Sequence, residues 1–187
     1  MSEVHLVKPH LAALPHYQAA LERGWSPDNV RGLAAAEEEL ARIAEDPAAF
    51  VASMDDTDAR GGDVTLPDGA KAPRLPGYRR WIWDGEFCGS IGFRWRPGSS
   101  TLPDYVLGHV GYAVVPWKEG RGCATAALRL LLPDAKARGL EYLELTTTED
   151  NPASQRVITA NGGVLVGAFE KSPHYGRGAA LRYRIAL

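Results

Sequence analysis

The stretch VVPWKEGRGCATAALRLLL, residues 114–132, decides the fold. A β-branched pair is followed by Pro116, two glycines stand at positions 120 and 122, and an Ala- and Leu-rich segment begins at once. Because proline ends a strand and glycine permits a sharp turn, this order predicts a strand that turns directly into a helix. The first N–H groups of a helix have no partner within it and attract anions. The stretch therefore predicts a phosphate site, with an ordinary strand-to-helix turn as the alternative.

Two other phosphate-binding motifs are absent from this stretch. It has no Gly-Lys-Ser or Gly-Lys-Thr, so it is not a Walker loop. It also lacks the three glycines of the full dinucleotide-binding pattern. A phosphate bound here would therefore be held by a different kind of turn.

The residues before this stretch predict an antiparallel meander. Segments 79–84 and 86–96 are rich in aromatic and β-branched residues and meet at Asp84-Gly85, a dipeptide typical of hairpin turns. A third strand is predicted at 108–115, ending at Pro116. Three such strands in sequence favour neighbours that run in alternating directions.

Helices and strands alternate around the meander. Helical spacing with closing glycines predicts helices at 124–138 and 153–161, and strands are predicted at 142–147, 164–169 and 180–187. Near the N-terminus a strand at 4–7 precedes helices at 11–21 and 33–50, the second interrupted by Pro47. The order predicts one α/β domain with a mixed sheet over residues 1–187.

Length and composition narrow the class of protein. The chain has 187 residues, 45% hydrophobic and 24% charged, which suits one packed domain. A net charge of -2 argues against a large nucleic-acid surface. The two cysteines, Cys88 and Cys123, lack metal-ligand spacing, so we expect no zinc cluster, no disulfide framework and a reducing cytoplasm. No apolar run reaches the ~20 residues of a membrane span.

The sequence resembles the GNAT superfamily of acyl-CoA-dependent N-acetyltransferases. The resemblance rests on Val114-Val115-Pro116, on the turn from Glu119 to Thr125, and on Asn151, which follows a predicted strand and opens a helix. It covers residues 78–170 well. It implies a meander followed by β-α-β-α-β with a splayed central sheet. The family has Arg or Gln where this chain has Glu119, and we expect Lys118 and Arg121 to compensate for that negative charge.

The resemblance also implies where acetyl-CoA, the co-substrate, would bind. The backbone of Val114 and Val115 would pair with the pantetheine arm, and Asn151 and Ser154 would line its other side. Each has a structural alternative, because Val114 suits a core and Asn151 suits a helix cap. The pyrophosphate would be held by the amides of Gly120, Arg121, Gly122, Cys123, Ala124 and Thr125. No metal is implied, and Cys123 is not expected to act as a nucleophile.

The catalytic groups are less well marked. By resemblance, the family's carboxylate base matches His109 and its tyrosine acid matches Ile158, so the acid is missing or comes from elsewhere. A histidine with an ordinary pKa near ~6.5 is a suitable base at neutral pH, and the alternative is a structural histidine. Glu144 and Glu149 are further candidate bases, and Tyr112 ranks below them. His174 is expected at the surface or on the acceptor rim.

The resemblance implies an enzyme that transfers acetyl from acetyl-CoA to a primary amine by direct attack through a tetrahedral intermediate. One alternative is a catalytically silent acyl-CoA-binding module, which the isoleucine at position 158 favours. Another is a transferase of the same fold that uses a different acyl donor, such as aminoacyl-tRNA. The sequence does not identify the acceptor, and it leaves both a monomer and a homodimer open.

Residues 55–77 form an unusual segment rich in Gly, Pro and Asp, with no regular period. It predicts a long loop that is a functional lid or locally disordered. Its five acidic residues exceed its three basic ones. An acidic rim would attract a cationic amine, so we expect the loop to border the acceptor side, with a solvated loop of no function as the alternative.

Overall fold

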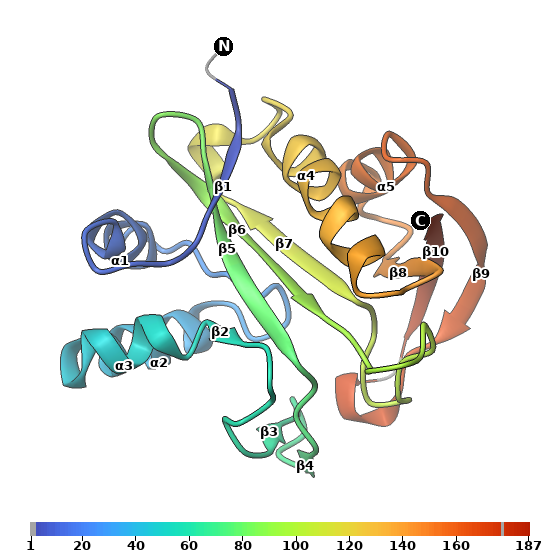
Figure 1. The fold of residues 1–187 in the computed structure, drawn as a ribbon, viewed down its shortest axis with the longest axis horizontal. Helices are drawn as coiled ribbons and strands as arrows, with labels where there is room; N and C mark the ends of the chain where they lie inside the picture. Colours follow the sequence, from blue (N-terminus) through green and yellow to red (C-terminus); the bar gives the residue numbers. More distant parts are fainter. Residues whose placement is uncertain (1–2, 177) are drawn as a thin grey trace.

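The computed structural model describes residues 3–176 and 178–187, which form two main sheets (Figure 1). The larger sheet has the order β1-β5-β6-β7, and β2 pairs with the outer end of β5. Its strands are β1 (His5–Val7), β2 (Asp55–Asp56), β5 (Gly77–Trp83), β6 (Phe87–Arg94) and β7 (Val110–Val114). The smaller sheet has the order β8-β10-β9. Its strands are β8 (Tyr142–Thr147), β9 (Val164–Glu170) and β10 (Ala179–Ala186).

The predicted meander is confirmed. β5, β6 and β7 are consecutive antiparallel neighbours, and the β5–β6 turn falls at the predicted Asp84-Gly85. Gly85 has φ 105°, a conformation that favours glycine and explains the dipeptide. The mixed α/β fold expected from the sequence is likewise confirmed.

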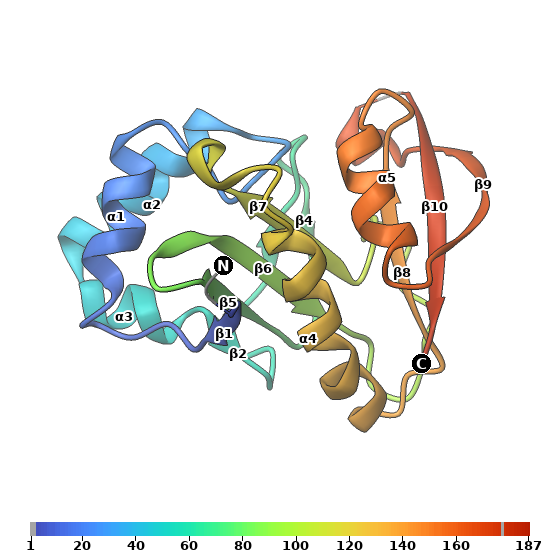
Figure 2. The same cartoon turned by 90° about the horizontal axis from the view of Figure 1, so that it is seen from above.

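The helices lie on both faces of the larger sheet (Figure 2). One face is covered by α1 (Leu14–Glu22), α2 (Leu33–Glu45) and α3 (Pro47–Ala52), and Pro47 begins α3 as its first residue. The aromatic cluster beneath them includes Tyr17, Trp25 and Trp81. The other face is covered by α4 (Cys123–Ala137), which continues through Pro133. α4 and α5 (Pro152–Thr159) share a second core with the smaller sheet.

β7 and β8 meet at one end and separate toward the other. At the meeting point the His109 N–H donates to the Glu144 carbonyl at 2.8 Å, and the Glu144 N–H donates to His109 Nδ1 at 2.8 Å. A Cβ on Gly108 would lie 3.0 Å from the Glu144 carbonyl oxygen, so glycine permits this close approach. The two sheets are thus joined at the vertex of a V, and the space between β7 and β8 opens beyond it.

Segment 55–77 has more structure than its sequence indicates. It contains β2 and a two-stranded hairpin of β3 (Val64–Thr65) and β4 (Lys71–Ala72). Strands of two residues are too short to show a period, which is why the sequence reads as an irregular loop. Leu66 and Ala72 are buried, so the segment is partly packed and not fully solvated. Within the described residues, the structure has no helix long and apolar enough to cross a membrane.

Candidate functional site

The turn that enters α4 has the geometry of an anion site. Gly120 and Gly122 have φ 72° and 77°, and neither has an atom within 4 Å of the place where a Cβ would stand. No side chain caps the α4 N-terminus, so the N–H groups of its first turn are not satisfied by a cap. The glycines keep side chains away from these donors, which a diphosphate group would need. The predicted phosphate residues therefore fit the group.

The outer edge of β7 turns the backbone groups of alternate residues away from β6, toward the gap. The Tyr112 carbonyl accepts a hydrogen bond from Asn29 Nδ2 at 3.0 Å, so it points away from β6. Because alternate residues of a strand share a direction, the backbone of Val114 also points to this edge. Val115 does not, since its N–H donates to the Cys88 carbonyl at 2.9 Å. Of the two residues expected to pair with an extended arm, only Val114 offers its backbone, which corrects the expectation for Val115.

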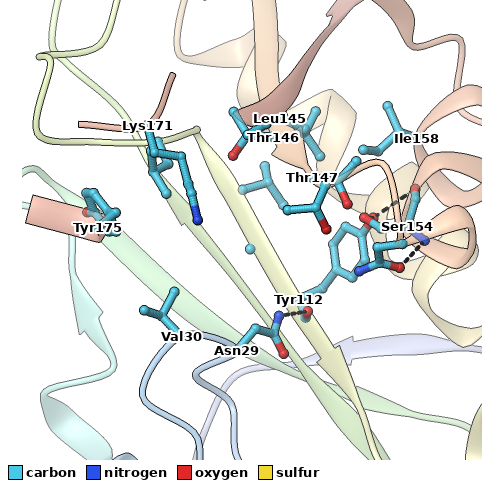
Figure 3. A pocket seen from close by; sticks show the side chains of 16 residues that line it. Asn29, Val30, Tyr112, Leu145, Thr146, Thr147, Ser154, Ile158, Lys171 and Tyr175 are labelled. Atoms are coloured by element: carbon cyan, nitrogen blue, oxygen red, sulfur yellow. Dashed lines mark hydrogen bonds between the residues drawn. The ribbon is translucent and has the colours of Figure 1, made fainter. Parts of the chain in front are cut away.

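A cavity of about 450 Å³ fills the V (Figure 3). One wall consists of Val110, Gly111 and Tyr112 from β7, and the opposite wall of Leu145 to Thr148 from β8 and the loop after it. Asn151, Ser154 and Ile158 close one end from the α5 side. The cavity brings together residues more than 100 positions apart in the sequence.

The predicted pair on α5 lies in this cavity and is preorganised. Asn151 Oδ1 accepts a hydrogen bond from the Ser154 N–H at 3.0 Å, so Asn151 caps α5. Ser154 Oγ lies 2.9 Å from the Tyr112 hydroxyl, which crosses the gap from β7. Asn151 therefore caps α5 and also lines the cavity. The two roles predicted for it, helix cap and cavity lining, are compatible.

Lys118 cannot serve the role expected of it. Its Nζ lies 2.9 Å from both Asp84 Oδ1 and Glu86 Oε2, and its side chain is only 9% exposed. These carboxylates raise the pKa of Lys118, whose charge they already neutralise. Of the two cations expected to compensate for Glu119, Arg121 is the one left exposed, beside a second hollow.

The two cysteines meet beneath this turn. Cys88 on β6 and Cys123 at the start of α4 are buried, and their Sγ atoms and a carboxylate oxygen of Asp84 lie within 4.8 Å of one another. Spacing along the chain indicated no such cluster, because only the packing of α4 on β6 creates it. Burial raises the pKa of the Cys88 thiol, and the hydrogen bond to Asp84 adds to that effect.

His109 is placed as a structural group. It is fully buried, and its Nδ1 lone pair is used by the Glu144 N–H. The neutral ring must then carry its proton on Nε2, so neither nitrogen has a free lone pair. Burial, assisted by the charges of Arg94 and Arg184 and opposed by the hydrogen bond from Glu144, lowers the pKa of His109 to about 4. The expectation of a catalytic base at His109 is corrected on this geometry.

The other candidate bases are also engaged or distant. Glu144 bridges Arg182 and Arg184 at 3.1 and 3.2 Å, with its side chain 13% exposed. Glu149 is exposed and does not line the cavity. His174 pairs with Asp68 of segment 55–77 at 2.7 Å, close to the surface.

Sequence reasoning missed the residues that frame the other end of the cavity. Asn29 and Val30 come from the α1–α2 connection, and Lys171 and Tyr175 from the β9–β10 connection. Figure 3 shows these side chains around one opening. They lie in irregular segments without a motif, so only the fold could reveal them. Tyr175 is the last residue of the short 3-10 helix Pro173–Tyr175.

Comparisons with known proteins support the fold. The structure resembles the microcin C7 self-immunity acetyltransferase MccE, solved with acetyl-CoA and AMP, with a TM-score of 0.61 and 13% identity. It resembles RimL, the ribosomal L7/L12 alpha-N-protein acetyltransferase solved with coenzyme A, with a TM-score of 0.63 and 14% identity. A GNAT-family acetyltransferase from Bacillus anthracis gives a TM-score of 0.62 and 15% identity. All three alignments cover 100% of this chain, and 94%, 96% and 96% of the other chains, respectively.

No curated protein matches the sequence significantly. The sequence does match a family defined as the acetyltransferase (GNAT) domain, over residues 20–164. That range takes in the meander, the glycine turn, β8 and α5, and so includes both long walls of the cavity and its α5 end. The resemblance seen in the sequence is thus confirmed, and the chain belongs to the GNAT acetyltransferase family.

Proposed function

We propose that this chain transfers the acetyl group of acetyl-CoA to a primary amine that enters the V-shaped cavity from the Asn29–Lys171 end. The observation that carries the proposal is the continuity of three features. The uncapped turn at Gly120–Gly122, the free edge at Val114 and the cavity between β7 and β8 follow one another along a single strand and its exit.

Each part of the co-substrate has a matching surface. The N–H groups from Gly120 to Thr125 would hold the pyrophosphate, with Arg121 adding a positive charge at the surface. The backbone of Val114 would pair with the amides of the extended arm in the manner of an added strand. Asn151 and Ser154 would line the opposite side. These roles rest on the local geometry and on membership of the family.

The reaction forms a C–N bond between the amine and the thioester carbonyl carbon and breaks the C–S bond. The leaving thiolate must take up a proton, and the positively charged nitrogen of the tetrahedral adduct must lose one to solvent to give the amide. We assign the donor to Tyr112, whose hydroxyl spans the gap and stands in the same cavity as Ile158. Burial raises the pKa of Tyr112, so its phenol keeps its proton at neutral pH and suits a proton donor.

Among the described residues that line the cavity, no carboxylate or imidazole is present. The geometry therefore favours an amine that enters already neutral, with water rather than a side chain as the proton acceptor.

Turnover of acetyl-CoA with a panel of amines, followed by release of free thiol, tests the proposal. We expect acetylation of at least one amine and saturable binding of coenzyme A by calorimetry. Binding of coenzyme A without turnover of any amine would instead favour the silent acyl-CoA-binding module. If coenzyme A does not bind, both the enzyme and the binding module are excluded.

A further inference from the structure

Two paired glycines form a floor beside the cavity, and Gly111 of this pair lines the cavity itself. Gly92 on β6 pairs directly with Gly111 on β7. The neighbours Ile91 and Phe93 pack toward α4, so position 92 faces the opposite side of the sheet, which α1, α2 and α3 cover. Because neither glycine has a side chain, the sheet leaves room at this point for part of a ligand.

Arg94 stands beside this floor on the same face. Its Nη2 atom would lie 3.6 Å from a Cβ on Gly111, so the guanidinium extends over the glycine. Among the described residues, no carboxylate lies within 4.0 Å of it. The nearby Asp28 has its Oδ1 atom engaged by the N–H groups of Val30 and Arg31.

Arg79, on the neighbouring strand β5 and on the same face, shows the contrast. Its guanidinium pairs with Glu39 at 2.7 Å and also donates to the Tyr17 hydroxyl at 2.9 Å. That arginine is structural and already neutralised. Arg94, by contrast, is exposed and has no carboxylate within 4.0 Å among the described residues, so its guanidinium is available to a ligand on this face.

Lys171 supplies a second cation from the other side of the opening. Figure 3 shows its side chain reaching over β7 into the cavity, opposite Val30 and Asn29. It is the one charged residue among the described residues of the lining. No described carboxylate lies within 4.0 Å of its Nζ.

Two unpaired cations at the mouth of an amine-binding cavity would repel an acceptor whose only charge is its ammonium. An anionic group on the acceptor would remove that repulsion and give each cation a partner. We propose that the acceptor amine carries a carboxylate or phosphate group, held over the Gly92–Gly111 floor by Arg94 and Lys171. This inference rests on the proposed function and names the class of its acceptor.

The same charges would also help the chemistry. A neighbouring cation lowers the pKa of an ammonium, so Arg94 and Lys171 would increase the neutral, nucleophilic fraction of the bound amine. This effect matches a cavity whose described lining offers no carboxylate base.

The test compares acceptors that differ only in the anion. β-Alanine is compared with β-alaninamide, and phosphoethanolamine with ethanolamine, by thiol release at saturating acetyl-CoA. We expect kcat/KM to be at least about tenfold higher for the anionic member of one pair, which is roughly what one charge-assisted contact contributes. A preference within the β-alanine pair identifies the anionic group of the acceptor as a carboxylate, and one within the ethanolamine pair identifies it as a phosphate.

Two variants locate the effect. Arg94→Gln and Lys171→Gln should each remove most of the preference for the anionic member, and should lower kcat/KM more for that member than for the neutral one. Lys136→Gln, an exposed lysine on α4, is the matched control and should change neither. Arg94→Glu should reverse the preference toward a diamine such as putrescine.

Calorimetry separates this proposal from the proposed function. Coenzyme A affinity should be unchanged in the Arg94 and Lys171 variants, since neither lies at the glycine turn. If these probes are not turned over, binding of each pair to the coenzyme A-saturated protein decides by the same criterion. Equal affinity for acid and amide, or an equal loss for both in the variants, would overturn the anionic acceptor while leaving acetyl transfer intact.

Discussion

The imidazole of His109 accepts a hydrogen bond at Nδ1 from the main-chain N–H of Glu144, 2.8 Å away. Together with the return bond from the His109 N–H to the Glu144 carbonyl, it joins the two sheets where β7 and β8 begin to separate. The His109 side chain thus accepts the hydrogen bond that a backbone carbonyl of a neighbouring strand would accept in a continuous sheet. His109 therefore holds the two sheets together at the vertex from which the cavity opens.

His109 should make stability depend on pH in a defined window. The pKa of His109 is about 4 in the folded protein and about 6.5 when unfolded, so acid favours the unfolded chain, which binds the proton more tightly. The contribution is complete above pH 6.5 and is lost as the pH falls toward 4, to a total of about 3 kcal/mol. Urea unfolding across this range, with His109→Gln as the comparison, should show the dependence only in the wild type.

The same variant should separate structure from catalysis. If His109 were the base, kcat/KM would rise with pH through ~6 to 7.5 and the variant would lose that limb. We expect the limb to be absent in the wild type. If the wild type does show this rise of kcat/KM with pH, and His109→Gln loses it, His109 would again be assigned as the catalytic base.

Gly122→Asp should weaken acetyl-CoA binding by about tenfold or more. The substitution puts a side chain and a negative charge beside the unsatisfied N–H groups of α4, at a residue with φ 77°. Calorimetry with coenzyme A measures the effect. Gly139→Asp, at the other end of α4 with φ 79°, imposes a similar backbone cost and should leave affinity unchanged.

Tyr112→Phe should lower kcat by about 10²-fold, the usual loss for a general acid, with little change in the acetyl-CoA KM. Ser154→Ala is the control, because it removes the hydrogen bond at 2.9 Å and leaves the phenol in place. A full rate in Tyr112→Phe would assign the proton on the leaving thiolate to solvent.

Joint neutralisation of Asp55, Asp56 and Asp58 should leave the acceptor KM and its salt dependence unchanged. Asp55 pairs with Lys8 and Arg80, Asp56 accepts from the N–H groups of Arg60 and Gly61, and none of the three lines the cavity. The expected effect is a lower Tm. A raised acceptor KM would support the acidic rim that the composition of this segment suggested.

Cys88 and Cys123 should resist alkylation in the folded protein. Both thiols are buried, and burial raises the pKa of Cys88, so little thiolate is exposed to reagent. Iodoacetamide at pH 8 should label neither site rapidly, and both after unfolding in guanidinium. Rapid labelling of the native protein at Cys123 would show that the turn before α4 opens readily.

The sequence alone determined the features whose cause is local. The turn at Asp84-Gly85, the glycine turn before α4 and the cap at Asn151 each depend on the conformational preference of a few adjacent residues. The hydrophobic period, together with the prolines and glycines that end each segment, likewise placed the long helices and strands and with them the fold; the phosphate site stays a prediction. The two-residue strands of segment 55–77 were missed because they have no period.

Tertiary structure decided which groups are free to react. His109 matches the position of a base, yet its lone pair is used by a strand 35 residues further along the chain. Lys118 is next to Glu119 in the sequence and was expected to compensate for its charge, but in the structure it pairs with Asp84 and Glu86. Conversely, Arg94 and Lys171 belong to no motif and are brought to one opening by the packing of two sheets. The protonation and availability of a group depend on its neighbours in space, and the chain order does not contain that information.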